Sequence, residues 1–205
     1  MKARWVTLVI SLLLISSIAT PKVCGQPTVG SEAPDFNLAT PYGYNVTLGD
    51  LISDGKPLVL IFFAYYCPHC RAELDQLSKE WKYCPSSDNA HVLLVGVSGE
   101  PEADQEYFES LGVKGWEFAE GTKEMVMDYE LYAVPTILVI SPDGVVRFAK
   151  IGPTEPRQLC DIVGRYSPPP AEESGLPGWA IPAIALAAVL AVALVLASGR
   201  KRRAK

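Results

Sequence analysis

Short apolar runs alternate with amphipathic segments through the middle of the chain. Residues 58–64 and 91–97 are almost continuously apolar, a pattern typical of strands buried on both faces of a sheet. Residues 67–82 and 101–111 place apolar side chains at helical spacing and predict two amphipathic helices. The remaining predicted elements are a helix capped by Thr122 and running to about Tyr129, strands over 136–140 and 145–150, and a last helix over 154–165.

The order of these elements predicts the fold class. Strands alternate with helices, which indicates an α/β domain, and we place it over residues 26–166. The last two strands are joined by Ser141-Pro142-Asp143-Gly144, a turn sequence typical of a hairpin. Because a hairpin makes these strands antiparallel, we expect a mixed central sheet rather than a purely parallel one.

The N-terminus has the pattern of a secretory signal peptide. Lys2 and Arg4 precede residues 5–19, an uncharged apolar run of 15 residues that is short for a membrane span. Val23 and Gly25 fit a cleavage after Gly25, so residues 1–25 are expected to be removed together with Cys24. An uncleaved N-terminal anchor is the alternative, whereas the residues before Cys24 do not fit lipoprotein processing.

A second apolar run predicts a C-terminal transmembrane helix over residues 178–198. Its uncharged centre, residues 179–197, is 19 residues long, enough for a helix to cross the hydrocarbon core of a membrane. A basic tail, residues 199–205, follows directly, and the positive-inside rule places it in the cytoplasm. The domain is then expected on the extracytoplasmic side of the cell membrane. A cell-surface sorting tail that is later cut off has a similar pattern and remains an alternative.

Between the domain and this run lies a proline-rich linker, residues 167–177. Its consecutive prolines favour extended polyproline II structure, and its composition offers no apolar core. We therefore expect a stiff spacer that holds the domain away from the membrane.

The distribution of charge agrees with this division. The chain has 18 Lys and Arg and 23 Asp and Glu, and all of the acidic residues lie between Glu32 and Glu173. Residues 26–175 contain 10 basic and 23 acidic residues, which gives a net charge of −13. Since phosphate backbones require a basic surface, nucleic acid is excluded as a partner.

The cysteines carry the candidate chemistry. Cys67-Pro68-His69-Cys70 is a C-x-x-C motif directly after a predicted buried strand and at the start of a helix, the context of a redox-active pair. The helix N-terminus favours a thiolate at Cys67, and a protonated His69 adds positive charge. Pro68 suits the first turn of this helix, because the backbone N–H that proline lacks would have no hydrogen-bond partner there. Zinc needs two further ligands, and His91 is expected in a core strand, so no metal or other cofactor is expected.

This motif, together with Val134-Pro135-Thr136 ahead of the hairpin, resembles the thioredoxin superfamily. Residues 30–38 resemble the opening of its TlpA-like branch and of peroxiredoxins, and the likeness covers roughly residues 29–166. It implies a thioredoxin-like three-layer α/β/α sandwich, with Cys67 as the attacking thiol and Cys70 as the resolving thiol. It also implies a cis peptide bond between Val134 and Pro135, packed against the active disulfide and contacting the substrate.

The chain departs from the family at the position of the buried acid. Classical thioredoxins carry that acid six residues before the first cysteine, where this chain has Ile61. Glu100 resembles the acid of the TlpA-like branch and is the candidate proton acceptor, and its alternative is a solvated loop glutamate. Residues 101–119 match the element that this branch inserts.

The resulting prediction is thiol–disulfide exchange with protein substrates, in which Cys67 forms a mixed disulfide that Cys70 resolves. A membrane redox partner is expected to reset the pair. The net direction of exchange, oxidation or reduction of the substrate, stays open. The Pro-His pair and Val134 resemble DsbA-type oxidases, whereas the rest of the domain sequence resembles TlpA-like reductases. A peroxidase is the main alternative, but Ala64 and Leu60 stand where peroxiredoxins need a hydroxyl residue and a proline. The other alternative is a non-enzymatic surface binding module with structural cysteines.

If Cys24 leaves and Cys67 and Cys70 form the redox pair, Cys84 and Cys160 remain. An oxidising exterior favours a structural disulfide between them. The expected geometry opposes it, because Cys84 lies at the far end of its helix while Cys160 lies about two turns into the last helix, nearer the active-site end. A disulfide and two buried, inert thiols both stay open.

Overall fold

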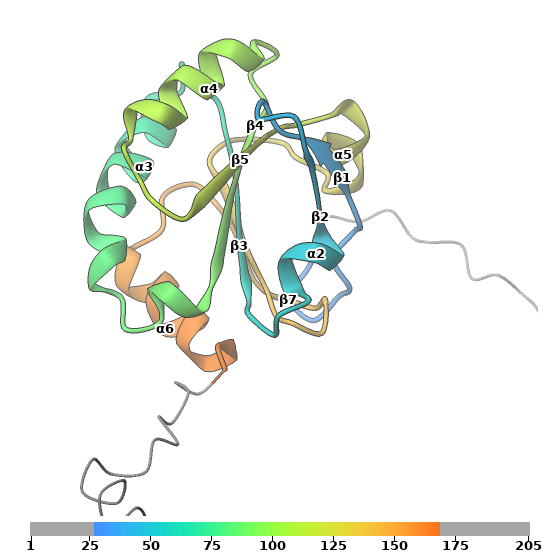
Figure 1. Cartoon of the computed structure of the whole chain (residues 1–205), viewed down its shortest axis with the longest axis vertical. Coiled ribbons are helices and arrows are strands. Elements are labelled where there is room, and N and C mark those ends of the chain that lie inside the picture. Colours follow the sequence, from blue (N-terminus) through green and yellow to red (C-terminus); the bar gives the residue numbers. More distant parts are fainter. Residues whose placement is uncertain (1–26, 169–205) are drawn as a thin grey trace, which may run out of the picture. The chain divides into compact units, whose positions relative to one another are not determined.

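Figure 1 shows the computed structural model of the chain, which describes residues 27–168. The predicted signal peptide (1–25), the transmembrane helix (178–198), the basic tail (199–205) and nearly all of the linker lie outside the described residues. Within residues 27–168, no helix combines the length and the apolar character that a membrane span requires.

A five-stranded mixed sheet forms the centre of the domain, in the strand order β5-β4-β3-β6-β7. The middle strand β3 (Leu58–Phe63) pairs in parallel with β4 (His91–Gly96) and antiparallel with β6 (Thr136–Ile140). Outside them, β5 (Trp116–Glu120) runs parallel to β4, and β7 (Val146–Ile151) runs antiparallel to β6. The mixed sheet expected from the hairpin is therefore confirmed.

Helices cover both faces of this sheet (Figure 1). One face packs against α3 (Pro68–Glu80), α4 (Pro101–Ser110) and α6 (Pro156–Tyr166). The other packs against α2 (Leu48–Ile52) and α5 (Lys123–Asp128). The three-layer α/β/α arrangement is the predicted one.

The sequence of β3 follows from its central place. Side chains of a strand alternate between the two faces, so Val59, Ile61 and Phe63 enter one apolar layer while the intervening residues enter the other. All six residues of β3 have no exposed surface. A strand buried on both faces has no place for a polar residue, which explains the continuous apolar run.

Several short elements escaped the prediction. They are β1 (Asn37–Ala39), β2 (Asn45–Thr47), α2, β5 and the 3-10 turns η1 (Trp81–Tyr83) and η2 (Ser87–Asn89). The boundaries of two helices also differ from the prediction. The helix expected to reach residue 82 ends at Glu80 and tightens into η1, and the helix expected from residue 154 begins at Pro156.

The chain leaves the domain at the end opposite the C-x-x-C motif. Cys67 follows the carboxyl end of β3, whereas Asn89 lies just before the amino end of the parallel strand β4. The Ser167 hydroxyl, directly after α6, donates a hydrogen bond to the Asn89 carbonyl at 3.2 Å. The last described residues are thus held at the far end of the sheet from Cys67.

Candidate active site

Two free thiols stand at the start of α3. Cys67 is the N-cap residue, Pro68 occupies the first turn, and the Cys67 N–H donates to the Ala64 carbonyl at 3.0 Å. Cys67 is partly buried, while Cys70 has no exposed surface. One sulfur therefore faces the exterior and the other lies beneath it, as attack and resolution require.

The surroundings of the two thiols shift their pKa values in opposite directions. Burial raises the pKa of Cys67, but hydrogen bonds from the backbone and thiol of Cys70 and from the His69 N–H outweigh it, so the pKa lies below that of an ordinary thiol. Burial is also the main cause that raises the pKa of Cys70 to about 12, and the charges of Cys67 and Asp104 add to it. Cys67 is thus the thiol that ionises first.

His69 acts on Cys67 through its backbone. Its N–H is among the groups that lower the pKa of Cys67, whereas its side chain is exposed. No hydrogen bond of the imidazole is found among the described residues. The contribution of a protonated imidazole stays a prediction.

The segment before β6 lies against the reactive sulfur. The Val134–Pro135 peptide bond is cis, and the Cys67 thiol donates a hydrogen bond to the Val134 carbonyl at a distance of 3.6 Å. On the other side, the Pro135 carbonyl accepts the Gly152 N–H at 2.8 Å. Pro135 is buried, so backbone rather than a bulky side chain is presented beside Cys67.

Glu100, the carboxyl expected from the sequence, bonds to a tyrosine rather than to either thiol. It is exposed, sits just before α4, and accepts the Tyr65 hydroxyl at 3.0 Å. This hydrogen bond is the main cause of the raised pKa of Tyr65. Two other carboxyls, Asp104 and Glu73, are buried near the thiols and were missed by the sequence analysis.

Asp104 lies inside the domain with 1% of its surface exposed. Its Oδ1 accepts the Tyr65 N–H at 2.8 Å and its Oδ2 accepts the Ser98 N–H at 3.0 Å. The approach to β4 is close, because a Cβ at Gly96 would stand 2.7 Å from the Asp104 side chain. Asp104 precedes Tyr107 and Phe108 by three and four residues and so lies on the apolar face of the helix. That position is the feature of the sequence from which its burial could have been predicted.

Glu73 lies one turn after Cys70 on the buried face of α3. Its Oε2 accepts the Thr154 N–H at 2.8 Å, while its Oε1 has no hydrogen-bond partner among the described residues. Burial raises the pKa of Glu73, although the Thr154 N–H and the charge of Lys150 oppose the shift. Burial and the raised pKa make the Glu73 carboxylate a better proton acceptor than an exposed glutamate.

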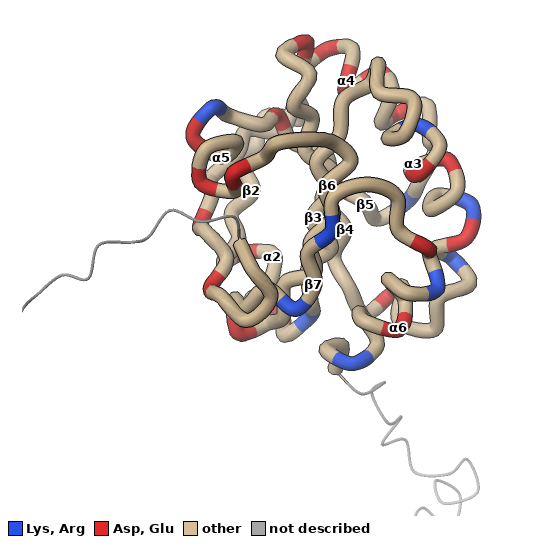
Figure 2. Tube along the Cα trace, turned by 180° about the vertical axis from the view of Figure 1, so that it is seen from behind, with Lys and Arg blue, Asp and Glu red and all other residues tan. Residues whose placement is uncertain are grey.

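An apolar groove of about 180 Å³ opens beside Cys67. Its walls include Ala64, Tyr66, Val126, Leu131, Tyr132 and Val134. One acid stands at its wall, since Glu130 accepts the Tyr132 hydroxyl at 2.8 Å. Figure 2 shows further acidic residues along α4 and around α5. The groove combines apolar walls with acidic surroundings.

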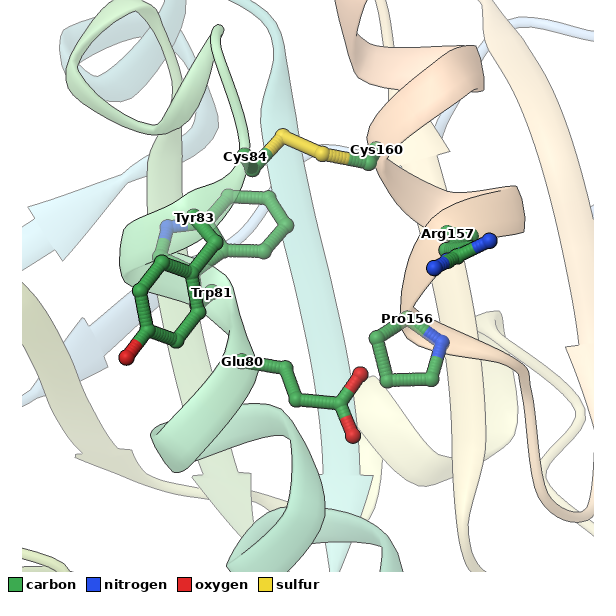
Figure 3. A pocket seen from close by; sticks show the side chains of 7 residues that line it. All are labelled: Glu80, Trp81, Tyr83, Cys84, Pro156, Arg157 and Cys160. Carbon is green, nitrogen blue, oxygen red and sulfur yellow. A yellow bond between two sulfur atoms is a disulfide. The ribbon is translucent and has the colours of Figure 1, made fainter.

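Cys84 and Cys160 form a disulfide, with their Cα atoms 5.6 Å apart (Figure 3). The expectation that Cys160 lies nearer the active-site end was wrong. Residues 152–155 carry the chain along α3 before α6 begins, as the bond from Thr154 to Glu73 shows. Pro156 then faces the end of α3 across a recess shared with Glu80. Cys84 follows η1, beyond the end of α3, and this course of the chain brings Cys160 to it.

Within the described residues, no cluster of three or more His, Cys, Asp or Glu side chains could hold a metal ion. The chemistry available at this site is that of two thiols, buried carboxyls and backbone groups.

Comparison with known proteins agrees with this geometry. Residues 29–149 match the AhpC/TSA family. The chain is 26% identical over 146 residues to the thiol-disulfide oxidoreductase ResA of Bacillus subtilis, covering 71% of this chain and 79% of ResA. It is 24% identical over 163 residues to the thiol:disulfide interchange protein DsbE of Yersinia pestis, covering 74% of this chain and 84% of that DsbE.

Solved structures show the same fold. The thioredoxin domain of a thiol-disulfide oxidoreductase from Bacteroides vulgatus matches with a TM-score of 0.58 and 20% identity, over 69% of this chain and 99% of that one. A thioredoxin family thiol:disulfide interchange protein from Chlorobium tepidum TLS also gives a TM-score of 0.58, with 23% identity, over 68% and 97%. At these identities the likeness shows a thioredoxin-like fold.

Proposed function

This chain belongs to the AhpC/TSA family and is a thiol–disulfide oxidoreductase of the thioredoxin superfamily, and we propose that Cys67 and Cys70 carry its exchange reaction. The observation that carries this proposal is the contrast between the two thiols. Cys67 is accessible and has a lowered pKa, whereas Cys70 is fully buried and has a pKa of about 12. Only Cys67 is then available as a nucleophile at neutral pH.

The exchange proceeds in two displacements. The Cys67 thiolate attacks one sulfur of a substrate disulfide, and the other substrate sulfur leaves as a thiolate and takes up a proton. Cys70 then loses its proton and attacks the Cys67 sulfur, which breaks the mixed disulfide and releases the second substrate thiol. The substrate gains two electrons and the Cys67–Cys70 pair becomes a disulfide. The reverse sequence oxidises a substrate dithiol.

The proton of Cys70 requires an acceptor within the domain. Glu73 fits this role because it lies one turn further along α3, is buried, and has a raised pKa. Glu100, the acceptor expected from the sequence, is exposed and already bonded to Tyr65, so we place it second.

The apolar groove is the proposed docking surface for the substrate chain. It reaches Val134, whose carbonyl lies beside the Cys67 sulfur, so a substrate cysteine bound there has its neighbouring residues over Leu131 and Tyr132. Glu130, which bonds to Tyr132 of the groove wall, favours basic residues in the substrate. Protein substrates with an apolar residue beside the cysteine are the preferred class.

We also propose that the chain is anchored in the cell membrane with the domain on the extracytoplasmic side. The support is the predicted signal peptide, the apolar run over residues 179–197, and the basic tail. An oxidising exterior also suits a domain that contains the Cys84–Cys160 disulfide. A redox protein of the same membrane is the proposed partner that resets Cys67 and Cys70.

A peroxidase is the second candidate function, because residues 30–38 resemble the opening of peroxiredoxins. Ala64 argues against it, since this buried residue offers a methyl group where a peroxidase needs a hydroxyl to orient the peroxide. Consumption of hydrogen peroxide at a rate comparable to disulfide exchange would favour the peroxidase.

The test of the exchange reaction uses three variants of the full-length chain. In a chain that also carries Cys84→Ser and Cys160→Ser, Cys67→Ser should abolish reduction or oxidation of a disulfide-containing protein, and Cys70→Ser should accumulate mixed disulfides that migrate as larger species without reductant. The control, Cys84→Ser with Cys160→Ser, should keep the exchange activity. Full activity in Cys67→Ser contradicts the assignment.

A further inference from the structure

We propose that the Cys84–Cys160 disulfide is a second thiol–disulfide exchange site, which accepts electrons from a protein dithiol. It lies away from Cys67 and Cys70, at the far end of α3. The inference goes beyond the proposed function, because it involves neither thiol of the C-x-x-C motif.

The disulfide opens on a recess of about 430 Å³ (Figure 3). The recess lies between η1 and α6, and its walls are Glu80, Trp81, Tyr83, Pro156 and Arg157 together with the two cysteines. Cys84 is 6% exposed, whereas Cys160 is only partly buried. Cys160 is therefore the more exposed residue of the pair, and we take its sulfur as the point of attack and Cys84 as the leaving group.

The walls of the recess suit a protein partner. Tyr83 is 76% exposed and offers an aromatic surface at the rim. Arg157 precedes Cys160 by three residues and so lies on the same side of α6, where its positive charge attracts a thiolate. Lys82 adds a second cation, with its Nζ 5.0 Å from the centre of the Tyr83 ring, and Glu80 is the acid of the same recess.

Apolar packing and hydrogen bonds hold α6 in place in addition to this bond. Leu159 and Val163 have no exposed surface and pack α6 into the same apolar layer as α3. The N–H of Thr154 and the hydroxyl of Ser167 fasten the two ends of the segment to Glu73 and Asn89. The two cysteines belong to neither apolar layer. The disulfide can therefore open while the domain stays folded, as a redox-active bond must.

The reaction is balanced by the partner's two thiols. One partner thiolate attacks the Cys160 sulfur, the bond to Cys84 breaks, and the Cys84 thiolate takes up a proton. The second partner thiol loses its proton and attacks the partner's own sulfur in the mixed disulfide, so Cys160 leaves and is protonated. The partner is oxidised to a disulfide by two electrons, and Cys84 and Cys160 become thiols.

The test isolates this site in the full-length Cys67→Ser, Cys70→Ser variant. Dithiothreitol in native buffer should reduce the Cys84–Cys160 bond at a rate proportional to its concentration, followed by alkylation and mass spectrometry. Reduced thioredoxin, as the protein dithiol, should become oxidised on mixing. A rate that does not depend on dithiothreitol, reduction only in denaturant, or thioredoxin that stays reduced would each overturn the proposal.

A pair of matched substitutions tests the role of the recess. Arg157→Gln should slow reduction roughly two- to fivefold, because an attracting charge is lost near the reacting sulfur. Arg165→Gln removes the same charge from an exposed position of the same helix and should leave the rate unchanged. Equal rates in the two variants would overturn the role of Arg157 and with it the recess as the route of attack.

Discussion

The carboxylate of Asp104 accepts the backbone N–H of Tyr65 at 2.8 Å, although the two residues are 39 positions apart in the sequence. The same carboxylate accepts the Ser98 N–H, so it joins the loops that follow β3 and β4. Tyr65 stands two residues before Cys67, and the charge of Asp104 contributes to the raised pKa of Cys70. A single buried acid thus positions the loop of one thiol and affects the ionisation of the other.

Replacing Asp104 with Asn should lower the pKa of Cys70, because a negative charge that opposes its ionisation is removed. The variant should also lose about 1–3 kcal/mol of unfolding free energy, since an amide cannot accept both N–H groups. Thiolate absorbance in a Cys67→Ser background measures the pKa, and urea unfolding measures the stability. Glu106→Gln, at an exposed position of the same helix, is the control. An unchanged Cys70 pKa in Asp104→Asn contradicts the electrostatic role.

The two thiols should react with iodoacetamide over different pH ranges. The thiolate fraction of Cys67 rises with pH through a lowered pKa, so its alkylation should reach a plateau at lower pH than that of free cysteine. Cys70 should stay unmodified at neutral pH, because its pKa is about 12 and it is buried. Mass spectrometry of the fully reduced, folded protein after brief exposure distinguishes the two positions. Comparable modification of Cys70 at pH 7 would be evidence against the assigned roles.

Glu73 makes the stability of the domain depend on pH. The pKa of Glu73 is raised in the folded state, so folding favours the protonated carboxyl. The protonated carboxyl stabilises the domain fully below the pKa that Glu73 has in the unfolded chain. This stabilisation is lost as the pH rises through the pKa of the folded state. Glu73→Gln removes the loss of stability at high pH, because glutamine does not ionise, and it keeps an oxygen that accepts the Thr154 N–H. At pH 8 the variant should have a larger free energy of unfolding than the natural chain, and the difference should vanish below about pH 4, the pKa range of a glutamate in the unfolded chain. Urea titrations at several pH values measure it, and a constant difference at all pH values excludes ionisation of Glu73 as the cause.

The apolar groove should affect protein substrates but not small disulfides. Tyr132→Ser removes an exposed aromatic wall and should lower kcat/KM for a disulfide-containing protein roughly fivefold, which corresponds to about 1 kcal/mol of apolar contact. Turnover of a small aromatic disulfide should stay the same. Tyr44→Ser, at another exposed tyrosine in the turn between β1 and β2, serves as the control. If both tyrosine variants reduce kcat/KM equally, the groove is not the docking surface.

The main parts of the fold could be predicted because their patterns are local. The fully apolar sequence of β3 and the turn between β6 and β7 were sufficient to predict a mixed, doubly covered sheet. Strands β1 and β2 have three residues each, too few to show a period. β5 is an edge strand that contains Glu117 and Glu120, so its sequence lacks the continuous apolar run of β3.

The candidate site was predicted where it depends on neighbours in the sequence. Cys67 and Cys70 form one motif at a strand-to-helix junction, and their contrast in burial follows from the first helical turn. Asp104 and Glu73 gain their importance from packing against distant segments, so the sequence suggested at most their place on an apolar helix face. The course of residues 152–155, which brings Cys160 to Cys84, is likewise set by contacts with α3.

The hydrogen bond between Ser167 and Asn89 determines which side of the domain the C-terminal end of α6 lies on. It fixes the departure of the chain at one pole of the domain, while Cys67 stands at the other, beyond the full length of β3, which is about 20 Å for six residues. The described residues therefore end at the pole of the domain that Cys67 does not occupy. The face that carries the reactive thiol is thus left open to an incoming protein by the last described residues of the chain.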